Sequence, residues 1–174
     1  DCSSASGATC TLTMTATKTA SATFAINTYT LTVTPSTGGS VSSSPAGITC
    51  GATCSATFNY NISVTLTATA SSGYTFAGWS GSGCSGVGTC SVTMTANKSV
   101  AATFTVANQT LTVTSPSNGT ITGLGINCPG DCTETYSYGS IVTLTANPAT
   151  GYSFSSWTSC DSASGATCTM TMTA

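Results

Sequence analysis

The sequence has almost no charge. Among its 174 residues, Lys and Arg together number 2, Asp and Glu number 4, and His is absent. Binding to nucleic acid requires a basic surface that neutralises phosphates, and a polybasic membrane-surface role requires a similar one. We therefore expect neither role. General acid–base and nucleophilic catalysis need His or paired carboxylates, so we predict that the protein is not an enzyme and that it uses no cofactor.

Long apolar runs are missing as well. Apolar residues make up 40% of the chain, but they occur in runs of only a few residues, whereas a transmembrane helix needs about 20. We therefore expect no membrane insertion. No window shows the 3.6-residue spacing of an amphipathic helix. The sequence thus predicts almost no helix.

The sequence repeats itself at about 80 residues. Residues 50–80 align without a gap to residues 128–158, with 13 identities, and residues 2–16 are nearly the same as residues 160–174. We interpret the chain as part of a longer array. Its expected parts are the end of one repeat (1–27), one complete repeat (28–106) and a repeat that lacks its last strand (107–174).

Hydroxyl side chains dominate the polar surface, with 39 Thr and 28 Ser. Thr alternates with apolar residues in nearly every segment, which is typical of a half-buried β-strand. In the complete repeat this alternation predicts strands at residues 30–34, 40–44, 54–59, 63–69, 74–79, 90–95 and 99–105. In a regular strand over the aromatic segment, Tyr74 and Phe76 would point to one face and Trp79 to the other. This conflict predicts a bulge or a surface-facing ring.

The ten cysteines recur at matched places in each repeat. Their even number and the absence of His indicate structural disulfides formed in an oxidising compartment. The spacing of the second pair varies between repeats, which a loop closed at its base tolerates. This favours local pairing: Cys2 with Cys10, Cys50 with Cys54, Cys84 with Cys90, Cys128 with Cys132, and Cys160 with Cys168. Crossed pairing and a structural zinc site of four thiolates stay open as alternatives.

Several segments together resemble a known family. The pattern G-Y-x-F-x-G-W at residues 73–79 and S-V-x-A-x-F at residues 99–104 are the most distinctive. They resemble the divergent relatives of the internalin B-repeat, a bacterial surface repeat. The remaining matching segments are residues 29–33, Gly38-Gly39, the C-x3-C loop, residues 64–68 and residues 92–95.

The resemblance implies secretion, tandem arrays in large extracellular or cell-surface proteins, and a small β-rich fold related to the β-grasp. It also implies a spacer or adhesive role. The expected fold is therefore all-β: tandem small β-sandwich or β-grasp-like repeats of about 80 residues, clipped by disulfides.

The joints between repeats favour a mechanical role. Residues 24–31 and residues 104–111 contain no Gly or Pro hinge, which favours a stiff connection. We expect a structural repeat of an extracellular bacterial filament, stalk or surface fibre, forming a rigid rod. The expected partners are neighbouring copies of the same repeat. Such copies either belong to one continuous chain, which the duplicated ends favour, or exchange a terminal strand.

The alternative function is an adhesin or carbohydrate-binding module. Its candidate sugar-stacking residues are Trp79, Trp157, Tyr60, Tyr136 and Tyr138, although core or joint positions are the favoured interpretation of the two tryptophans. Rows of Thr would also suit an ice or crystal surface if the sheet were flat. Asn61, Asn97, Asn108 and Asn118 lie in N-x-[ST] sequons, which makes glycans a further class of partner.

Overall fold

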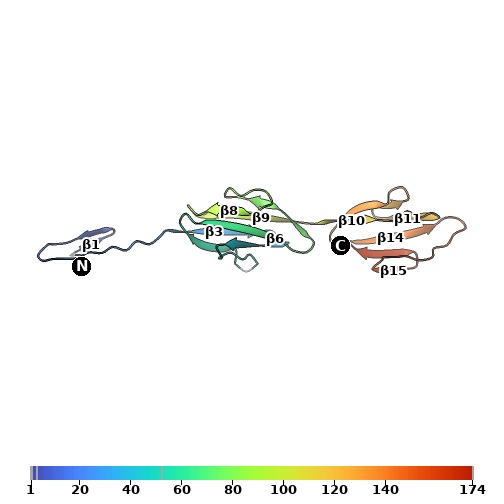
Figure 1. Cartoon of the computed structure of the whole chain (residues 1–174). Coiled ribbons are helices and arrows are strands. Elements are labelled where there is room, and N and C mark those ends of the chain that lie inside the picture. The colour runs from blue at the N-terminus through green and yellow to red at the C-terminus, as the bar shows by residue number, and fades with distance from the viewer. Residues whose placement is uncertain (1, 3, 52, 174) are drawn as a thin grey trace.

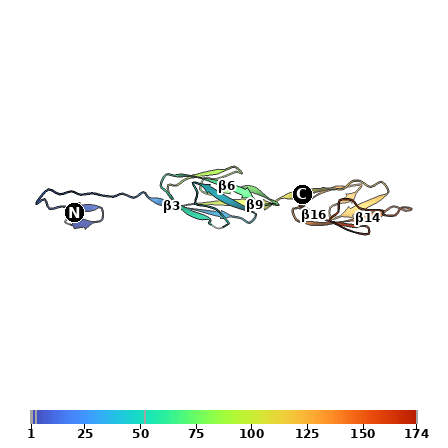
Figure 2. The same cartoon turned by 60° about the horizontal axis from the view of Figure 1, so that its bottom comes forward.

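The computed structural model describes residue 2, residues 4–51 and residues 53–173; Asp1, Ser3, Ala52 and Ala174 lie outside this part. Its described residues form strands and no helix, as predicted. No helix capable of crossing a membrane is found in them. Figures 1 and 2 show three bodies in a row, which we name the N-terminal hairpin, the central module and the C-terminal module.

The N-terminal hairpin is small. It consists of β1 (Ser4–Ser6) and β2 (Thr9–Thr11), which pair antiparallel. Residues 17–27 carry no strand assignment and lead to the first strand of the central module. In Figure 1 this connection appears as an extended stretch between the two bodies.

The central module is a sandwich of two sheets. One sheet has the strand order β5-β3-β9-β7 and the other the order β4-β6-β8. The strands are β3 (Thr28–Pro35), β4 (Gly39–Ser44), β5 (Ser55–Asn59), β6 (Ser63–Ala70), β7 (Tyr74–Ser80), β8 (Cys90–Thr93) and β9 (Lys98–Val106).

Alternation of side chains builds the core between these sheets. On β6, Val64 and Leu66 are fully buried, while Ser63 and Thr67 on the opposite face are exposed. Successive side chains of a strand point to opposite faces, so each apolar residue of the alternating sequence reaches the interior. The hydroxyls left outside pair across strands, as between Thr65 and Ser91 of β8, whose side-chain oxygens lie 3.2 Å apart.

The first and last strands of the central module lie side by side. β3 pairs parallel with β9, in a register that places Leu31 opposite Lys98 and Val33 opposite Val100. β9 also pairs antiparallel with β7, so it lies inside its sheet with a strand on each side. Closure of the module therefore depends on a pairing between residues about 67 apart in sequence, since Lys98 and Leu31 are partners.

The aromatic strand β7 contains the predicted bulge. Its register with β9 shifts between Phe76 and Gly78, and Gly78 has φ 143°, a backbone conformation that favours glycine. The extra residue restores Trp79 to the buried face, where its ring contacts that of Phe76 edge-on at 5.0 Å between centroids. Of the two predicted alternatives, the structure therefore shows the bulge and not a surface-facing ring.

The C-terminal module repeats this plan in part. A two-stranded sheet pairs β10 with β13, and a second sheet has the order β12-β11-β14-β16-β15. The strands are β10 (Asn108–Thr112), β11 (Gly119–Gly123), β12 (Asn127–Cys128), β13 (Thr133–Ser137), β14 (Ile141–Pro148), β15 (Ser162–Ser164) and β16 (Thr167–Thr171).

Two strands of the central module have no counterpart among the strands described for the C-terminal module. Residues 152–158, which match β7 in sequence, carry no strand assignment, and no strand there corresponds to β9. The consequence appears in the burial of matched residues. Leu31 is fully buried, whereas its counterpart Leu111 is half-buried, and Trp79 is buried whereas Trp157 is half-buried.

The five disulfides each close a short loop. They join Cys2 to Cys10, Cys50 to Cys54, Cys84 to Cys90, Cys128 to Cys132 and Cys160 to Cys168. Loop-closure arguments give rings of this size a stabilising effect of about 2–3 kcal/mol each. That is a substantial share of the stability of a small domain.

Removing the Cys84–Cys90 disulfide should destabilise the central module. Both cysteines are buried, so the double variant Cys84→Ala, Cys90→Ala should lose about 2–3 kcal/mol of unfolding free energy. Urea unfolding monitored by tryptophan fluorescence measures the loss. The matched control is Cys2→Ala, Cys10→Ala, because this disulfide lies in the separate N-terminal hairpin, which contains no tryptophan, so its removal should leave the measured unfolding unchanged. Equal losses of unfolding free energy for the two double variants would contradict the stabilising role of the Cys84–Cys90 disulfide in the central module.

Stability should fall at alkaline pH because of Tyr136. Burial, and to a smaller extent the carboxylate of Glu134, raise the pKa of Tyr136, whose hydroxyl donates a hydrogen bond to the Leu124 carbonyl. Folding thus favours the neutral phenol. Its contribution is complete below the unfolded-state pKa of about 10 and is lost as the pH rises through the folded-state pKa. Urea unfolding at pH 8 and pH 11 should show a smaller loss for Tyr136→Phe; an identical loss in both proteins would refute the explanation.

Candidate functional site: the joint between the modules and the groove of the C-terminal module

The cysteines are committed to disulfides. Every cysteine of the chain is paired, which leaves no thiolate for the zinc alternative. Within the described ranges, no group of three or more His, Cys, Asp or Glu residues could hold a metal ion.

Two of the candidate sugar-stacking residues belong to the core. Trp79 is 5% exposed, and its indole N–H donates a 2.6 Å hydrogen bond to the carbonyl of Gly88 in the loop that Cys84–Cys90 closes. Tyr136 is likewise buried. A sugar-stacking platform needs an open ring face, so these two residues are wrong candidates and the core interpretation of Trp79 is right.

The other three candidates lie at the joint or in a groove. Tyr138 is half-buried where the two modules meet, and Tyr60 is 49% exposed at the matching position of the central module. Trp157 is half-buried and lines a cavity in the C-terminal module. These positions define two features, the joint and the groove.

The joint consists of a single residue between two strands. β9 ends at Val106 and β10 begins at Asn108, so only Ala107 links the modules. The N–H of Ala107 donates to the carbonyl of Gly73 in the central module at 2.8 Å. Its carbonyl accepts from the N–H of Tyr138 in the C-terminal module, also at 2.8 Å. Both polar groups of the linker are thus bonded, one to each module.

The ring of Tyr138 lies against Gly73. Gly73 occupies the turn before β7 with φ 76°, and a Cβ at this position would overlap the Tyr138 ring. The hydroxyl of Tyr138 lies 3.2 Å from that of Ser72 in the same turn. Glycine is therefore required here both for the backbone conformation and for the close approach of the ring.

Each module also carries one half of this kind of joint at its outer end. The central module has the counterpart of Tyr138, and the C-terminal module has the counterpart of Gly73. The N–H of Tyr60 donates to the carbonyl of Asn27 at 2.8 Å, as the N–H of Tyr138 does to that of Ala107. Gly151 occupies the turn that matches Gly73, with φ 85°, and a Cβ on it would meet no atom within 4 Å. Sequence comparison could have found these residues, since Gly73 and Gly151 recur as do Tyr60 and Tyr138, but recurrence does not reveal that they meet across a boundary.

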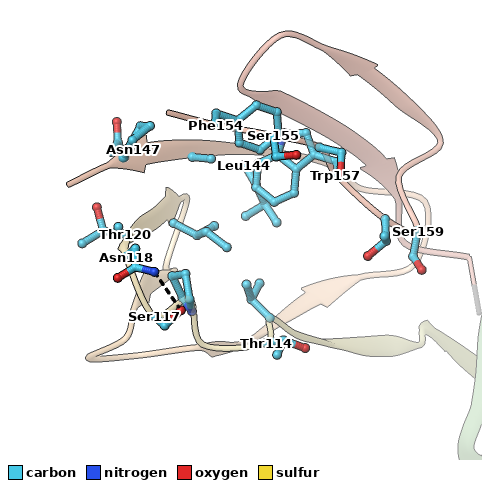
Figure 3. Close-up of a pocket in the computed structure, with 18 of the residues that line it drawn as sticks. Thr114, Ser117, Asn118, Thr120, Leu144, Asn147, Phe154, Ser155, Trp157 and Ser159 are labelled. Carbon is cyan, nitrogen blue, oxygen red and sulfur yellow. Dashed lines mark hydrogen bonds between the residues drawn. The ribbon is translucent and has the colours of Figure 1, made fainter. Parts of the chain in front are cut away.

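The groove of the C-terminal module is a cavity of about 630 Å³. Residues 111–114, along and just beyond β10, form one wall, and Phe154 and Trp157 form the opposite wall; Figure 3 shows Thr114 and these two rings on opposite sides of the open space. Leu144 and Met170 line it from the other sheet.

The groove occupies the place that β9 takes in the central module. There, β9 lies between β3 and β7 and contributes the buried side chains Val100, Ala102 and Phe104. The counterparts of β3 and β7 form the two walls of the groove. The indole N–H of Trp157 is buried without a hydrogen-bond partner, whereas that of Trp79 is bonded; such an unmet donor costs about 1–3 kcal/mol.

Two of the four sequon asparagines have hydrogen-bonded side chains. The Asn97 side-chain carbonyl accepts from the N–H of Thr30 at 2.9 Å, and the Asn118 amide donates to the hydroxyl of Ser117 at 3.4 Å, shown in Figure 3. Asn61 has φ 65° in a tight turn. Glycosylation of these residues stays a prediction.

Comparison with known families identifies the class of the protein. The model of the divergent InlB B-repeat domain matches residues 29–108 and again residues 109–174. The chain therefore belongs to this family of surface repeats and contains two copies in tandem. No curated protein and no solved structure matches the chain.

Replacing Gly73 should loosen the joint. In Gly73→Ala the new methyl group overlaps the Tyr138 ring, and overpacking of this kind costs about 1–3 kcal/mol. Gly151→Ala is the matched control, because it carries the same backbone strain without a neighbouring ring. NMR relaxation, measured on dilute monomer, should give separate tumbling times for the two modules in Gly73→Ala but a common one in the control. A common tumbling time in both variants would show that the ring contact does not hold the joint.

Proposed function

We propose that the chain is a structural repeat segment of an extracellular bacterial filament, stalk or surface fibre, in which disulfide-braced β-modules form a rigid rod. The observation that carries the proposal is the joint. A one-residue linker bonded on both sides, with the Tyr138 ring seated on Gly73, leaves the two modules little freedom to swivel. Repeats joined rigidly in this way act as a spacer of fixed length.

The disulfides and the low charge of the chain support an extracellular location. All ten cysteines are in disulfides, which persist in oxidising compartments. Family membership is consistent with this location, since the matching domain is a surface repeat. The nearly uncharged hydroxyl surface has few groups that respond to pH or salt, which suits a fibre exposed to variable surroundings.

The adhesin alternative has lost most of its candidate residues. Trp79 and Tyr136 present no open ring face because both are buried, and Tyr138 is engaged at the joint. Tyr60 alone of the five is exposed. The spacer role is therefore better supported than carbohydrate binding.

Small-angle X-ray scattering tests the rod. The radius of gyration should stay constant between low and high salt, because screening acts on charges and the chain has very few. Insertion of Gly-Ser-Gly-Ser between Ala107 and Asn108 should broaden the distance distribution, since such linkers behave as flexible coils. If the native chain already scatters like the insertion variant, its modules are not rigidly joined and the rod is wrong.

A further inference from the structure

We propose that the central module bears tension along the chain, and that the ladder between β3 and β9 is the clamp that carries this load. The proposal goes beyond stiffness. A rigid spacer keeps its length when it is bent, whereas this module keeps its length when it is pulled. The proposal rests on the proposed fibre role only for the source of the load, because a fibre held at two points is pulled along its length.

The chain enters and leaves the central module at opposite ends of one ladder. Entry is at Thr28, the first residue of β3, and exit is at Val106, the last residue of β9. Because β3 and β9 run parallel, the start of β3 lies toward the start of β9, and Val106 lies at the other end. Figures 1 and 2 show the chain reaching the module on one side and leaving it on the other. Tension on the chain therefore pulls the two strands in opposite directions along their common axis.

Load in this direction acts on all pairs of the ladder together. The register joins five residue pairs, from Leu31 opposite Lys98 to Pro35 opposite Ala102. Hydrogen bonds between parallel strands are evenly spaced along the ladder, so they share a load applied along the strands. Pulling both strands from the same end would instead open the pairs one after another. The ladder should therefore resist axial tension better than it resists peeling.

Two side chains extend the ladder beyond its backbone pairs. Before the first pair, the side-chain carbonyl of Asn97 accepts from the N–H of Thr30 at 2.9 Å. After the last pair, the N–H of Ser36 donates to the carbonyl of Ala102 at 2.9 Å. The hydroxyl of Ser36 also accepts from the N–H of Phe104 at 2.7 Å. Both ends of the ladder, where a sliding strand would first come loose, are thus held by additional hydrogen bonds.

Neither strand of the ladder lies at the edge of its sheet. β5 pairs with the other side of β3, and β7 pairs with the other side of β9. Within the ladder, Val33 lies opposite Val100 and both are buried. A slip by one residue would turn such side chains out of the core. Sliding of the two strands therefore requires the ladder and the core contacts to break together.

The disulfides do not bridge the ladder. Cys50–Cys54 and Cys84–Cys90 each close a loop of the central module, and neither loop contains a residue of β3 or β9. Axial load on the folded module is therefore carried by noncovalent contacts. After the clamp breaks, the two disulfides still hold back the residues inside their loops, which limits the extension of the unfolded module.

Pulling in two directions tests the clamp. Handles are attached to azide-bearing residues of the full chain, at Ala22 and Thr110 for axial load and at Ala22 and Ala96 for peeling. All three positions are exposed. Thr110 lies in β10 just past the joint, which leaves the rest of the C-terminal module outside the loaded path, and Ala96 lies between β8 and β9.

The two directions should give different rupture forces at equal loading rates in optical tweezers. Forced unfolding is governed by the unfolding rate, and axial load must break the five pairs together. The axial rupture force should therefore be several times the peeling force. Equal forces in the two directions, or a higher force for peeling, would overturn the proposal.

The length released identifies the element that breaks. Unfolded residues 28–106 extend by at most about 3.5 Å each, apart from those in the two closed loops, so the axial event should release about 200–240 Å. Cys84→Ala, Cys90→Ala opens a loop of sequence separation 6 and should add about 15 Å to this release. A much shorter release with no change in the double variant would show that an element other than the clamped module breaks, which contradicts the proposal.

A substitution at one end of the ladder separates the two directions of load. Ser36→Ala removes the hydroxyl that accepts from Phe104, at the end of the ladder that lies farther from Ala96. The axial rupture force should fall, while the peeling force should stay the same because peeling begins at the opposite end.

Ser43→Ala is the matched control. The Ser43 hydroxyl also accepts a backbone N–H, that of Ile48 at 3.0 Å, but Ser43 lies on β4 in the other sheet. Both variants should lower the midpoint of urea unfolding, and only Ser36→Ala should lower the axial rupture force. Equal axial forces for the two variants would refute the clamp.

The clamp and the rod fail separately. Scattering that shows a flexible joint would refute the rigid rod, while a difference between axial and peeling forces would still support the clamp. A stiff chain whose central module breaks at the same force in both directions would refute the clamp alone.

Discussion

The parallel pairing of β3 with β9 is the contact on which each module depends. It joins the first strand of the module to the last, and β9 fills the centre of its sheet with buried side chains. The module is therefore closed only when its final segment is in place. The C-terminal module shows the consequence: without a described counterpart of β9, its β7-like residues are not a strand, Leu111 is only half-buried, and a groove separates the walls.

The same strand that closes one module also begins the connection to the next. β9 leads through Ala107 directly into β10, and the turn before β7 receives Tyr138. Closure of a module and the linker of the joint after it thus belong to one continuous stretch of backbone. Repeat proteins whose neighbours are coupled in this way have stabilities set by each unit and by each interface.

The sequence predicted the strands of the central module well because Thr and apolar residues alternate there so regularly that one face is exposed and the other buried, as on β6. It predicted either a bulge in β7 or a surface-facing ring, because Trp79 would point away from the face of Tyr74 and Phe76 in a regular strand, and the structure shows the bulge. It could not predict that β3 and β9 pair, because parallel pairing of distant segments leaves no local signal. Nor could it reveal that Tyr138 contacts Gly73, since these residues belong to different repeats and meet only once both modules have folded. The sequence indicated that residues 107–174 lack a last strand, but it could not give the walls or the volume of the groove, because these depend on packing.

The surface shows how a nearly uncharged protein keeps its strands in register. Hydroxyl pairs connect neighbouring strands on the outer faces, as between Thr75 and Thr105 at 3.1 Å and between Thr32 and Ser55 at 3.4 Å. Such pairs act over short distances and do not depend on ionic strength, and β-branched Thr favours extended backbone. The cost is at the edges, since charged residues normally keep exposed strand edges from pairing with other chains. With so few charges, the chain offers little of this protection at its exposed edges.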